Sequence, residues 1–135
     1  MQTFLPYPDI TKSVQCLDWK RLGNQRVEAK HILDILRKQR HPGRWKYHPA
    51  VKMWNKHINA LALYMNACIQ HWIERGYNNT MIPHRIRGHI SMPSWFGNPA
   101  FHASHRSNLL RKNPEWYGQF GWKEPDDMKY VWPYV

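Results

Sequence analysis

The strongest helical pattern in the chain lies in residues 49–75, PAVKMWNKHINALALYMNACIQHWIER. Its apolar side chains recur at alternating spacings of three and four, which matches one face of an α-helix. They are Val51, Trp54, Ile58, Leu61, Met65, Cys68 and Trp72. The pattern predicts a long core helix from about Ala50 to Arg75, with Pro49 in its first turn and Gly76 as its stop.

Upstream, the sequence predicts another long helix, from about Lys12 to Arg40. Thr11 or Ser13 is expected to cap its start, and His41-Pro42-Gly43 to end it. Gly23-Asn24 predicts a break or kink within it. The second half carries an apolar stripe that is wide enough to face a core, made of Val27, Ala29, Ile32, Leu33, Ile35 and Leu36.

Downstream, prolines and glycines predict that residues 77–99 are irregular. A third helix is expected from Ala100 to about Lys112, before Pro114. The tail, residues 115–135, is rich in aromatic side chains and is expected to pack back on the body. We therefore expect an all-α fold: one compact domain over residues 1–135, with three helices, long ordered loops and an aromatic C-terminal tail.

The composition points to a polyanionic partner. The 135 residues suit one domain, and 20 Lys and Arg against 9 Asp and Glu give a net charge of +11. Nucleic acid is the first candidate for a small body with that charge. A membrane surface is a weaker candidate, because the cations are spread along the chain instead of lying on one amphipathic helix.

Several other classes of protein are disfavoured by the sequence. No apolar run approaches the ~18 residues of a membrane span, and the N-terminus does not resemble a signal peptide. Cys16 and Cys68 form no disulfide framework, so a reducing cytoplasm is the expected compartment. The nine histidines lack metal-ligand spacing, and no phosphate-binding loop is present. We expect no metal site and no cofactor.

Residues 15–28, QCLDWKRLGNQRVE, are the most informative polar stretch. One interpretation is a cleft wall with a carboxylate, amide donors and phosphate-binding arginines. The other is a solvated helix face with one Asp18–Arg21 pair. Two further stretches, residues 45–49 and 101–122, combine basic groups with aromatics, which suits phosphate contacts and base stacking.

Four features, in order along almost the whole chain, resemble the phage pyrimidine-dimer DNA glycosylases of the endonuclease V type. They are Gln15 with Arg26-Val27, the long helix that begins at Pro49, its exit Glu74-Arg75-Gly76-Tyr77-Asn78, and Pro114-Glu115-Trp116-Tyr117 with Gly121 after it. The resemblance implies a compact three-helix fold and a bifunctional glycosylase and abasic-site lyase. In that family the N-terminal α-amine attacks the anomeric carbon, a Schiff base forms, and β-elimination nicks the strand. The resemblance also implies a flipped-out base.

The chain departs from the family pattern at three positions. Gly23 aligns with the family's catalytic glutamate, so Asp18 or Glu28 would have to supply the carboxylate. Gln2 is bulky, so Met1 is expected to stay and to provide the amine. Cys16 takes the place of a family histidine near the lesion.

The resemblance yields a set of site residues. We expect Met1, Glu28 and Asp18 to be catalytic, and we expect DNA contacts from Gln15, Arg21, Arg26, His48, Arg106, Trp116 and Tyr117. The expected partner is double-stranded DNA, bound by a monomer at the nucleoid of a bacterial or phage-infected cell, with no membrane association. Two alternatives remain: another base-modifying enzyme on the same fold that acts on a modified pyrimidine, and a non-catalytic DNA-binding module.

Overall fold

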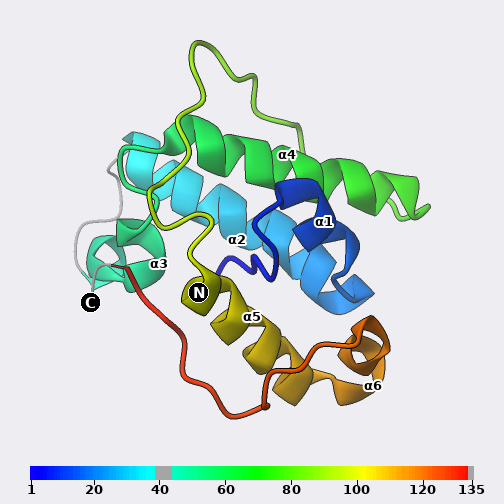
Figure 1. The fold of residues 1–135 in the computed structure, drawn as a ribbon. Helices are drawn as coiled ribbons and strands as arrows, with labels where there is room; N and C mark the ends of the chain where they lie inside the picture. Colours follow the sequence, from blue (N-terminus) through cyan, green and yellow to red (C-terminus); the bar gives the residue numbers. More distant parts are fainter. Residues whose placement is uncertain (39–43, 134–135) are drawn as a thin grey trace.

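The computed structural model describes residues 1–38 and 44–133 and contains only helices and irregular segments there (Figure 1). Its elements, in chain order, are α1 (Ile10–Gln15), α2 (Trp19–Lys38), the 3-10 helix η1 (Arg44–Tyr47), α3 (Pro49–Lys52), α4 (Ile58–Glu74), α5 (Pro99–Lys112), α6 (Pro114–Tyr117) and the 3-10 helix η2 (Gly118–Phe120). The predicted all-α class is confirmed. None of the helices in the described ranges combines the length and the apolar character that a bilayer span needs.

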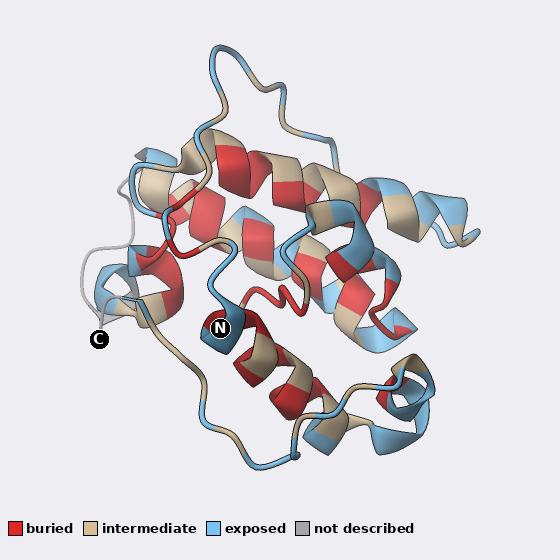
Figure 2. Cartoon of the chain, in the orientation of Figure 1, coloured by how far each residue is buried: buried red, intermediate tan, exposed pale blue. Residues whose placement is uncertain are grey.

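The core is built around α2 and α4, which lie side by side; α5 lies below them, and the N-terminal segment runs between (Figures 1 and 2). Fully buried side chains come from all three long helices and from the turns between them. The largest include Leu17, Leu22, Ile32, Trp54, Leu61, Tyr64, Ile69, Phe101 and Leu109. The three predicted helices therefore correspond to α2, α4 and α5, although the short helices add detail that the sequence pattern did not indicate. Val27, which the pattern placed on the core stripe, is exposed.

The predicted break at Gly23-Asn24 is wrong, because α2 runs through it and the chain turns earlier, at residues 16–18. A side chain of α6 stabilises that turn, because the Trp116 indole donates a hydrogen bond to the Cys16 carbonyl at 2.7 Å. Gly23 serves helix packing instead. A Cβ there would lie 3.0 Å from the ring of Trp72 on α4, so glycine lets the two helices approach closely.

The ends of this first predicted helix also differ from expectation. Neither Thr11 nor Ser13 is the N-cap; Asp9 caps α1, and its carboxylate accepts from the Lys12 N–H at 2.9 Å. The predicted end at Arg40 and the stop at residues 41–43 lie outside the described residues.

The predicted continuous helix from Ala50 to Arg75 is also wrong, because it is divided into α3 and α4 by a turn at residues 53–57. The Trp95 indole donates to the Met53 carbonyl at 2.9 Å, so a distant side chain replaces a helical hydrogen bond that the turn removes. Lys56 in that turn has a φ of 69°, which no helix accommodates. Pro49 and Gly76 do mark the outer ends, as expected.

The third helix and the tail agree with the sequence. α5 begins at Pro99, one residue before the predicted Ala100, and ends at Lys112. The tail crosses α5 and is held by its hydroxyls: the N–H groups of Met128 and Val131 donate to Ser107 and Ser104 at 3.0 and 3.2 Å. Its aromatic side chains, Trp122, Tyr130 and Trp132, pack against the core.

Candidate functional site

The N-terminal segment, residues 2–6, has no regular secondary structure and runs between the central helices and α5 (Figure 1). Side chains of α2 and α4 hold its first half. The Phe4 N–H donates to Gln25 Oε1 at 2.9 Å, and the Gln25 amide donates to the Gln2 carbonyl at 2.9 Å. The Tyr64 hydroxyl donates to the Phe4 carbonyl at 2.9 Å. The backbone next to Met1 is therefore fixed by long-range hydrogen bonds.

Side chains of α5 hold the second half of the same segment. The Leu5 N–H donates to His105 Nδ1 at 3.0 Å, and His102 Nδ1 lies 2.7 Å from the Leu5 carbonyl. Arg106 donates to the Pro6 carbonyl at 2.7 Å. Because buried polar backbone is costly unless it is paired, these contacts explain why α5 is polar on its buried face.

Acidification from about pH 7 to about pH 5 is expected to destabilise the protein by about 2 kcal/mol through His105 alone. Burial, and secondarily the charge of His102, lowers the pKa of His105 to about 3. In the unfolded chain the imidazole titrates at about 6.5, so below that pH the unfolded state binds a proton that the folded state does not. This stability is complete above pH ~6.5 and falls as the pH drops toward 3. Urea unfolding midpoints at the two pH values measure the loss, and equal midpoints would contradict a neutral His105.

The N-terminus opens into a pocket of about 380 Å³ between α2, the C-terminal end of α5 and the tail. Four of the predicted site residues line it together: Met1, Arg21, Glu28 and His48. The other lining residues are Gln2, Phe4, Lys20, Asn24, Gln25, Lys112, Tyr130 and Trp132. The pocket thus brings an α-amine, a carboxylate and an imidazole to one place, with cations beside them.

The pKa of His48 reflects the two charges that the pocket holds near its ring. Burial lowers this pKa most, the positive N-terminus of Met1 lowers it further, and Glu28 opposes both. His48 Nδ1 accepts from the Ala50 N–H at 3.0 Å and caps α3, which fixes the ring orientation. His48 therefore lies within electrostatic reach of both the amine and the carboxylate.

Cations gather on the side of the pocket where α2 and α5 approach each other. Lys20, Arg21 and Lys112 line it, and Arg111 is close by. Burial lowers the pKa of Lys112 most, and the charges of Arg21 and Arg111 lower it further. A cluster of cations this close together favours a polyanion such as the phosphate backbone.

Aromatic rings form another wall of the pocket. Tyr130 lies 5.7 Å from Trp132 and 6.5 Å from Phe4 between ring centroids. Trp132 also meets His48 edge to face at 6.1 Å. Flat apolar walls of this kind suit the faces of a nucleobase.

Sequence reasoning missed most of these lining residues. Lys20, Asn24 and Glu28 recur every fourth residue and therefore share one face of a helix. The predicted site residue Glu28 could thus have indicated Lys20 and Asn24 as neighbours in the site. Tyr130 and Trp132 come from an irregular tail, and no local pattern indicates which aromatic side chains of the tail reach the pocket.

Asp18, the other candidate carboxylate, lies outside the pocket. It is buried, with the Tyr117 hydroxyl donating to one oxygen at 2.5 Å and Arg21 at 3.2 Å from the other. Burial and the neighbouring carboxylate raise the pKa of Tyr117. The Asp18–Arg21 pair of the solvated-face interpretation exists, but its carboxylate is buried instead of solvated.

Four predicted DNA contacts have intramolecular partners. Arg26 lies over the Trp72 ring at 4.4 Å and donates to Asn79 at 2.6 Å. Gln15 is exposed, and its carbonyl accepts from Arg75 at 2.9 Å. Trp116 and Tyr117 support the turn at residues 16–18.

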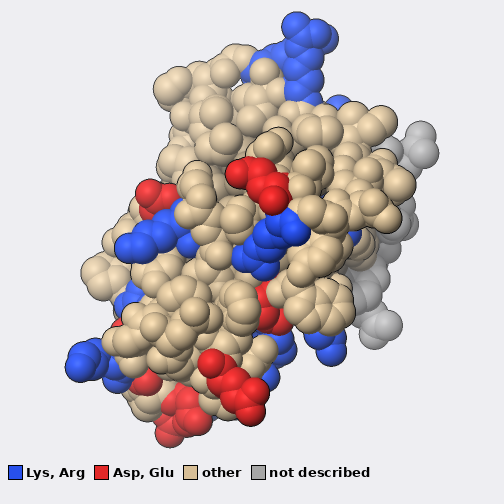
Figure 3. Space-filling model, turned by 90° about the vertical axis from the view of Figure 1, so that its right-hand side faces the viewer, with Lys and Arg blue, Asp and Glu red and all other residues tan. Residues whose placement is uncertain are grey.

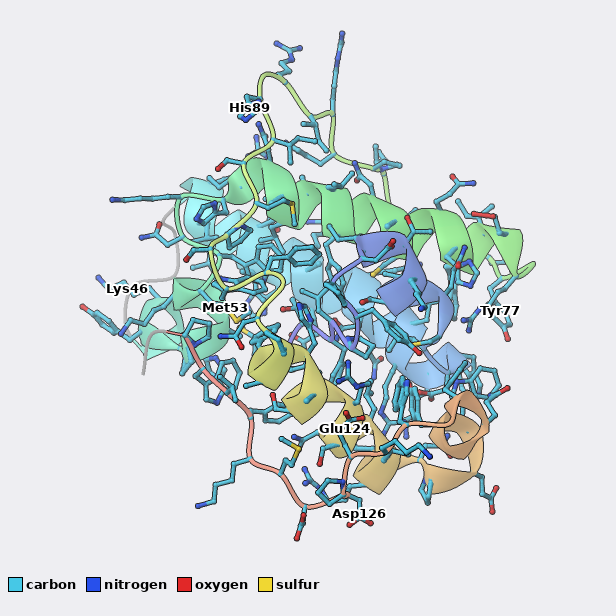
Figure 4. The ribbon with its side chains drawn as sticks, in the orientation of Figure 1. Lys46, Met53, Tyr77, His89, Glu124 and Asp126 are labelled. Atoms are coloured by element: carbon cyan, nitrogen blue, oxygen red, sulfur yellow. The ribbon has the colours of Figure 1, made fainter. Side chains whose placement is uncertain are left out.

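Arg106 is likewise used within the protein. It forms an ion pair of 2.9 Å with Glu124, whose side chain lies beside α5 (Figure 4). None of Gln15, Arg26, Arg106, Trp116 and Tyr117 lines the pocket, and contact between these residues and DNA stays a prediction.

Of the three positions that depart from the resemblance, Gln2 lines the pocket, whereas Gly23 and Cys16 do not. The Gly23 Cα faces Trp72 on α4, so a side chain at that position would meet α4. Cys16 is buried, its thiol donates to the Ser13 carbonyl at 3.2 Å, and burial raises its pKa to about 12. Neither position contributes a reactive group.

Comparisons with known proteins identify one family. The family model described as pyrimidine dimer DNA glycosylase matches residues 1–83, which is more than half of the chain. The match covers the N-terminal segment and α1 to α4, and it ends before α5. Searches among curated proteins and among solved structures found no match.

Proposed function

The chain belongs to the pyrimidine dimer DNA glycosylase family, whose substrate is DNA, and from this premise we propose that it excises a damaged or modified pyrimidine from double-stranded DNA and then nicks the abasic site. The observation that carries the proposal is the pocket that Met1 shares with Glu28, at the end of a hydrogen-bonded N-terminal segment. The proposed enzyme acts as a monomer, without a cofactor, at the nucleoid.

In the proposed reaction the neutral Met1 amine is the nucleophile. Its nitrogen bonds to C1′ of the target nucleotide as the glycosidic bond breaks, and the base leaves with the bonding electrons and takes up a proton. Loss of a proton from the attacking nitrogen and opening of the sugar give an iminium. Removal of a C2′ proton then breaks the C3′–O bond and nicks the strand.

Glu28 is the carboxylate of this scheme. It lines the pocket beside Met1, where it can accept a proton from the amine and later from C2′. Asp18 is less suited to that role, because Tyr117 and Arg21 already occupy its two oxygens.

The other pocket residues have binding roles in the proposal. Arg21, Lys20 and Lys112 contact the phosphates on either side of the target nucleotide. Tyr130 and Trp132 support the nucleotide after it leaves the base stack, since a duplex base is out of reach until it is flipped. The proposed carboxylate is at position 28 of α2, whereas the family's glutamate aligns with Gly23. This difference favours a second candidate function, another reaction on a modified pyrimidine in DNA.

Borohydride trapping tests the proposal. The protein is incubated with duplexes that carry an abasic site, a cyclobutane thymine dimer or a modified pyrimidine, then reduced, and any adduct is mapped. We expect a covalent complex at Met1 on the abasic duplex and on the duplex with the substrate base, because reduction fixes the iminium. Tight binding to all three duplexes with no adduct would overturn the lyase mechanism and favour the second candidate or a binding module.

A further inference from the structure

A second basic surface lies away from the pocket, where residues 84–89 cross α4. It comprises Arg37 at the end of α2, Lys56 before α4, and His84, Arg85, Arg87 and His89, and we call it the 84–89 surface. Two adjoining hollows, of about 620 and 380 Å³, share Ile58 and Asn59 as their floor. No lining residue is common to this surface and the Met1 pocket.

Two asparagines of α4 hold the backbone of residues 84–89 in place. Asn66 accepts from the His84 N–H and donates to its carbonyl, each at 2.8 Å. Asn59 donates to the carbonyls of Arg87 and His89, each at 3.0 Å. The segment that carries Arg85 and Arg87 is therefore fixed to the helix, and His89 lies on it at one end of the molecule (Figure 4).

Among the described residues, the cations of this surface have no acidic partner, and Arg37 Nη1 approaches His84 Nδ1 at 3.5 Å. In residues 1–38 and 44–133, none of Arg37, Lys56, Arg85 and Arg87 takes part in an ion pair. Figure 3 shows Lys or Arg side chains at the tip of the molecule with no acidic side chain beside them. Burial lowers the pKa of His84 most, and the charge of Arg37 lowers it further, as expected of a positive surface.

The 84–89 surface and the pocket lie on opposite faces of the two central helices. On α4, Asn59 and Asn66 stand roughly 140° and 160° around the helix from Tyr64, which binds the N-terminal segment. On α2, Arg37 lies nine residues after Glu28, which corresponds to about 180°. One straight duplex cannot touch both faces.

We infer that the 84–89 surface binds the phosphate backbone of a second DNA segment while the pocket holds the first. The inference rests on the proposed function only in taking DNA as the ligand of the pocket. A single duplex would have to turn through about 180° around the protein to reach both surfaces, well beyond the 40–90° bends of most protein-bent sites. Two separate segments reach both faces without such bending.

The stoichiometry of short duplexes tests this inference. Duplexes of about 12 bp, ~40 Å long, carry a non-cleavable abasic analogue so that the pocket fills without reaction. Native mass spectrometry and sedimentation should find two duplexes per wild-type protein and one per R85Q/R87Q protein. The second binding step should weaken about tenfold or more, and its salt slope should fall by about 1.8 for two lost phosphate contacts.

Matched variants separate this result from a general loss of charge. K12Q/K123Q removes two exposed cations outside both surfaces and should keep two duplexes. R21Q/K112Q, in the pocket, should lose the first duplex and keep the second. One duplex per wild-type protein, or two on R85Q/R87Q, would overturn the inference. Because stoichiometry is read without catalysis, failure of the trapping experiment would leave this test intact.

Discussion

Acetylation of the Met1 α-amine is expected to abolish borohydride trapping and strand nicking, by at least about 10³-fold. An acetylated nitrogen has no nucleophilic lone pair and cannot form an iminium, whereas the rest of the pocket is unchanged. Binding should persist, because acetylation leaves unchanged Arg21, Lys20 and Lys112, the cations of the pocket that we propose as phosphate contacts. The measurement compares single-turnover nicking and Kd for the acetylated and free proteins on the same abasic duplex.

One added residue before Met1 provides an independent test of the same nucleophile. It moves the amine by up to about 3.6 Å, while the hydrogen bonds of Gln25 and Tyr64 hold the native segment in place. We expect nicking to fall with little change in folding stability. If the acetylated protein still forms the adduct, the nucleophile is another amine, and Lys20 and Lys112 are the two that line the pocket.

The helices were predictable where burial and period coincide. Leu61, Met65 and Cys68 follow the α4 period. Pro49 and Gly76 mark helix ends, because the backbone of each has its own conformational limits. The turn at residues 53–57 was not predictable, because Trp95, forty-two residues away, provides the hydrogen bond that stabilises it. Gly23 predicted a break in the helix, but the structure explains the glycine by the close approach of Trp72 on α4.

The candidate site likewise divides into residues that the local sequence indicates and residues whose contacts come from distant parts of the chain. Met1, Arg21, Glu28 and His48 were predicted and share the pocket, because the first is a chain end and the others lie on or beside helices with a readable period. Arg26 and Arg106 looked equally suited to phosphate from the sequence. Their partners, Trp72 and Glu124, are distant in the chain, so only the fold reveals those contacts.

Glu28→Gln is expected to slow the chemical step by about 10²- to 10⁴-fold, the usual contribution of a positioned acid or base. Glutamine keeps the size and the hydrogen-bonding reach of the side chain but cannot take a proton from the amine or from C2′. Affinity for the abasic duplex should hold or increase, since a negative charge is removed from the pocket that we propose binds DNA phosphates. Single-turnover rates at saturating protein separate the two effects, and Glu74→Gln, at the exposed end of α4, controls for loss of one acidic charge.

Asp18→Asn separates the two candidate carboxylates. Because Asp18 is buried against Tyr117 and Arg21, this change should lower the free energy of unfolding by about 1–3 kcal/mol. The chemical rate of the folded molecules should stay within a few-fold of the wild type, since this carboxylate does not reach the pocket. The opposite pattern is a slow chemical step in the Asp18→Asn variant and a wild-type rate in the Glu28→Gln variant. It would mean that Asp18 leaves Tyr117 when DNA binds. The catalytic carboxylate would then lie in the turn just before α2 instead of on its third turn.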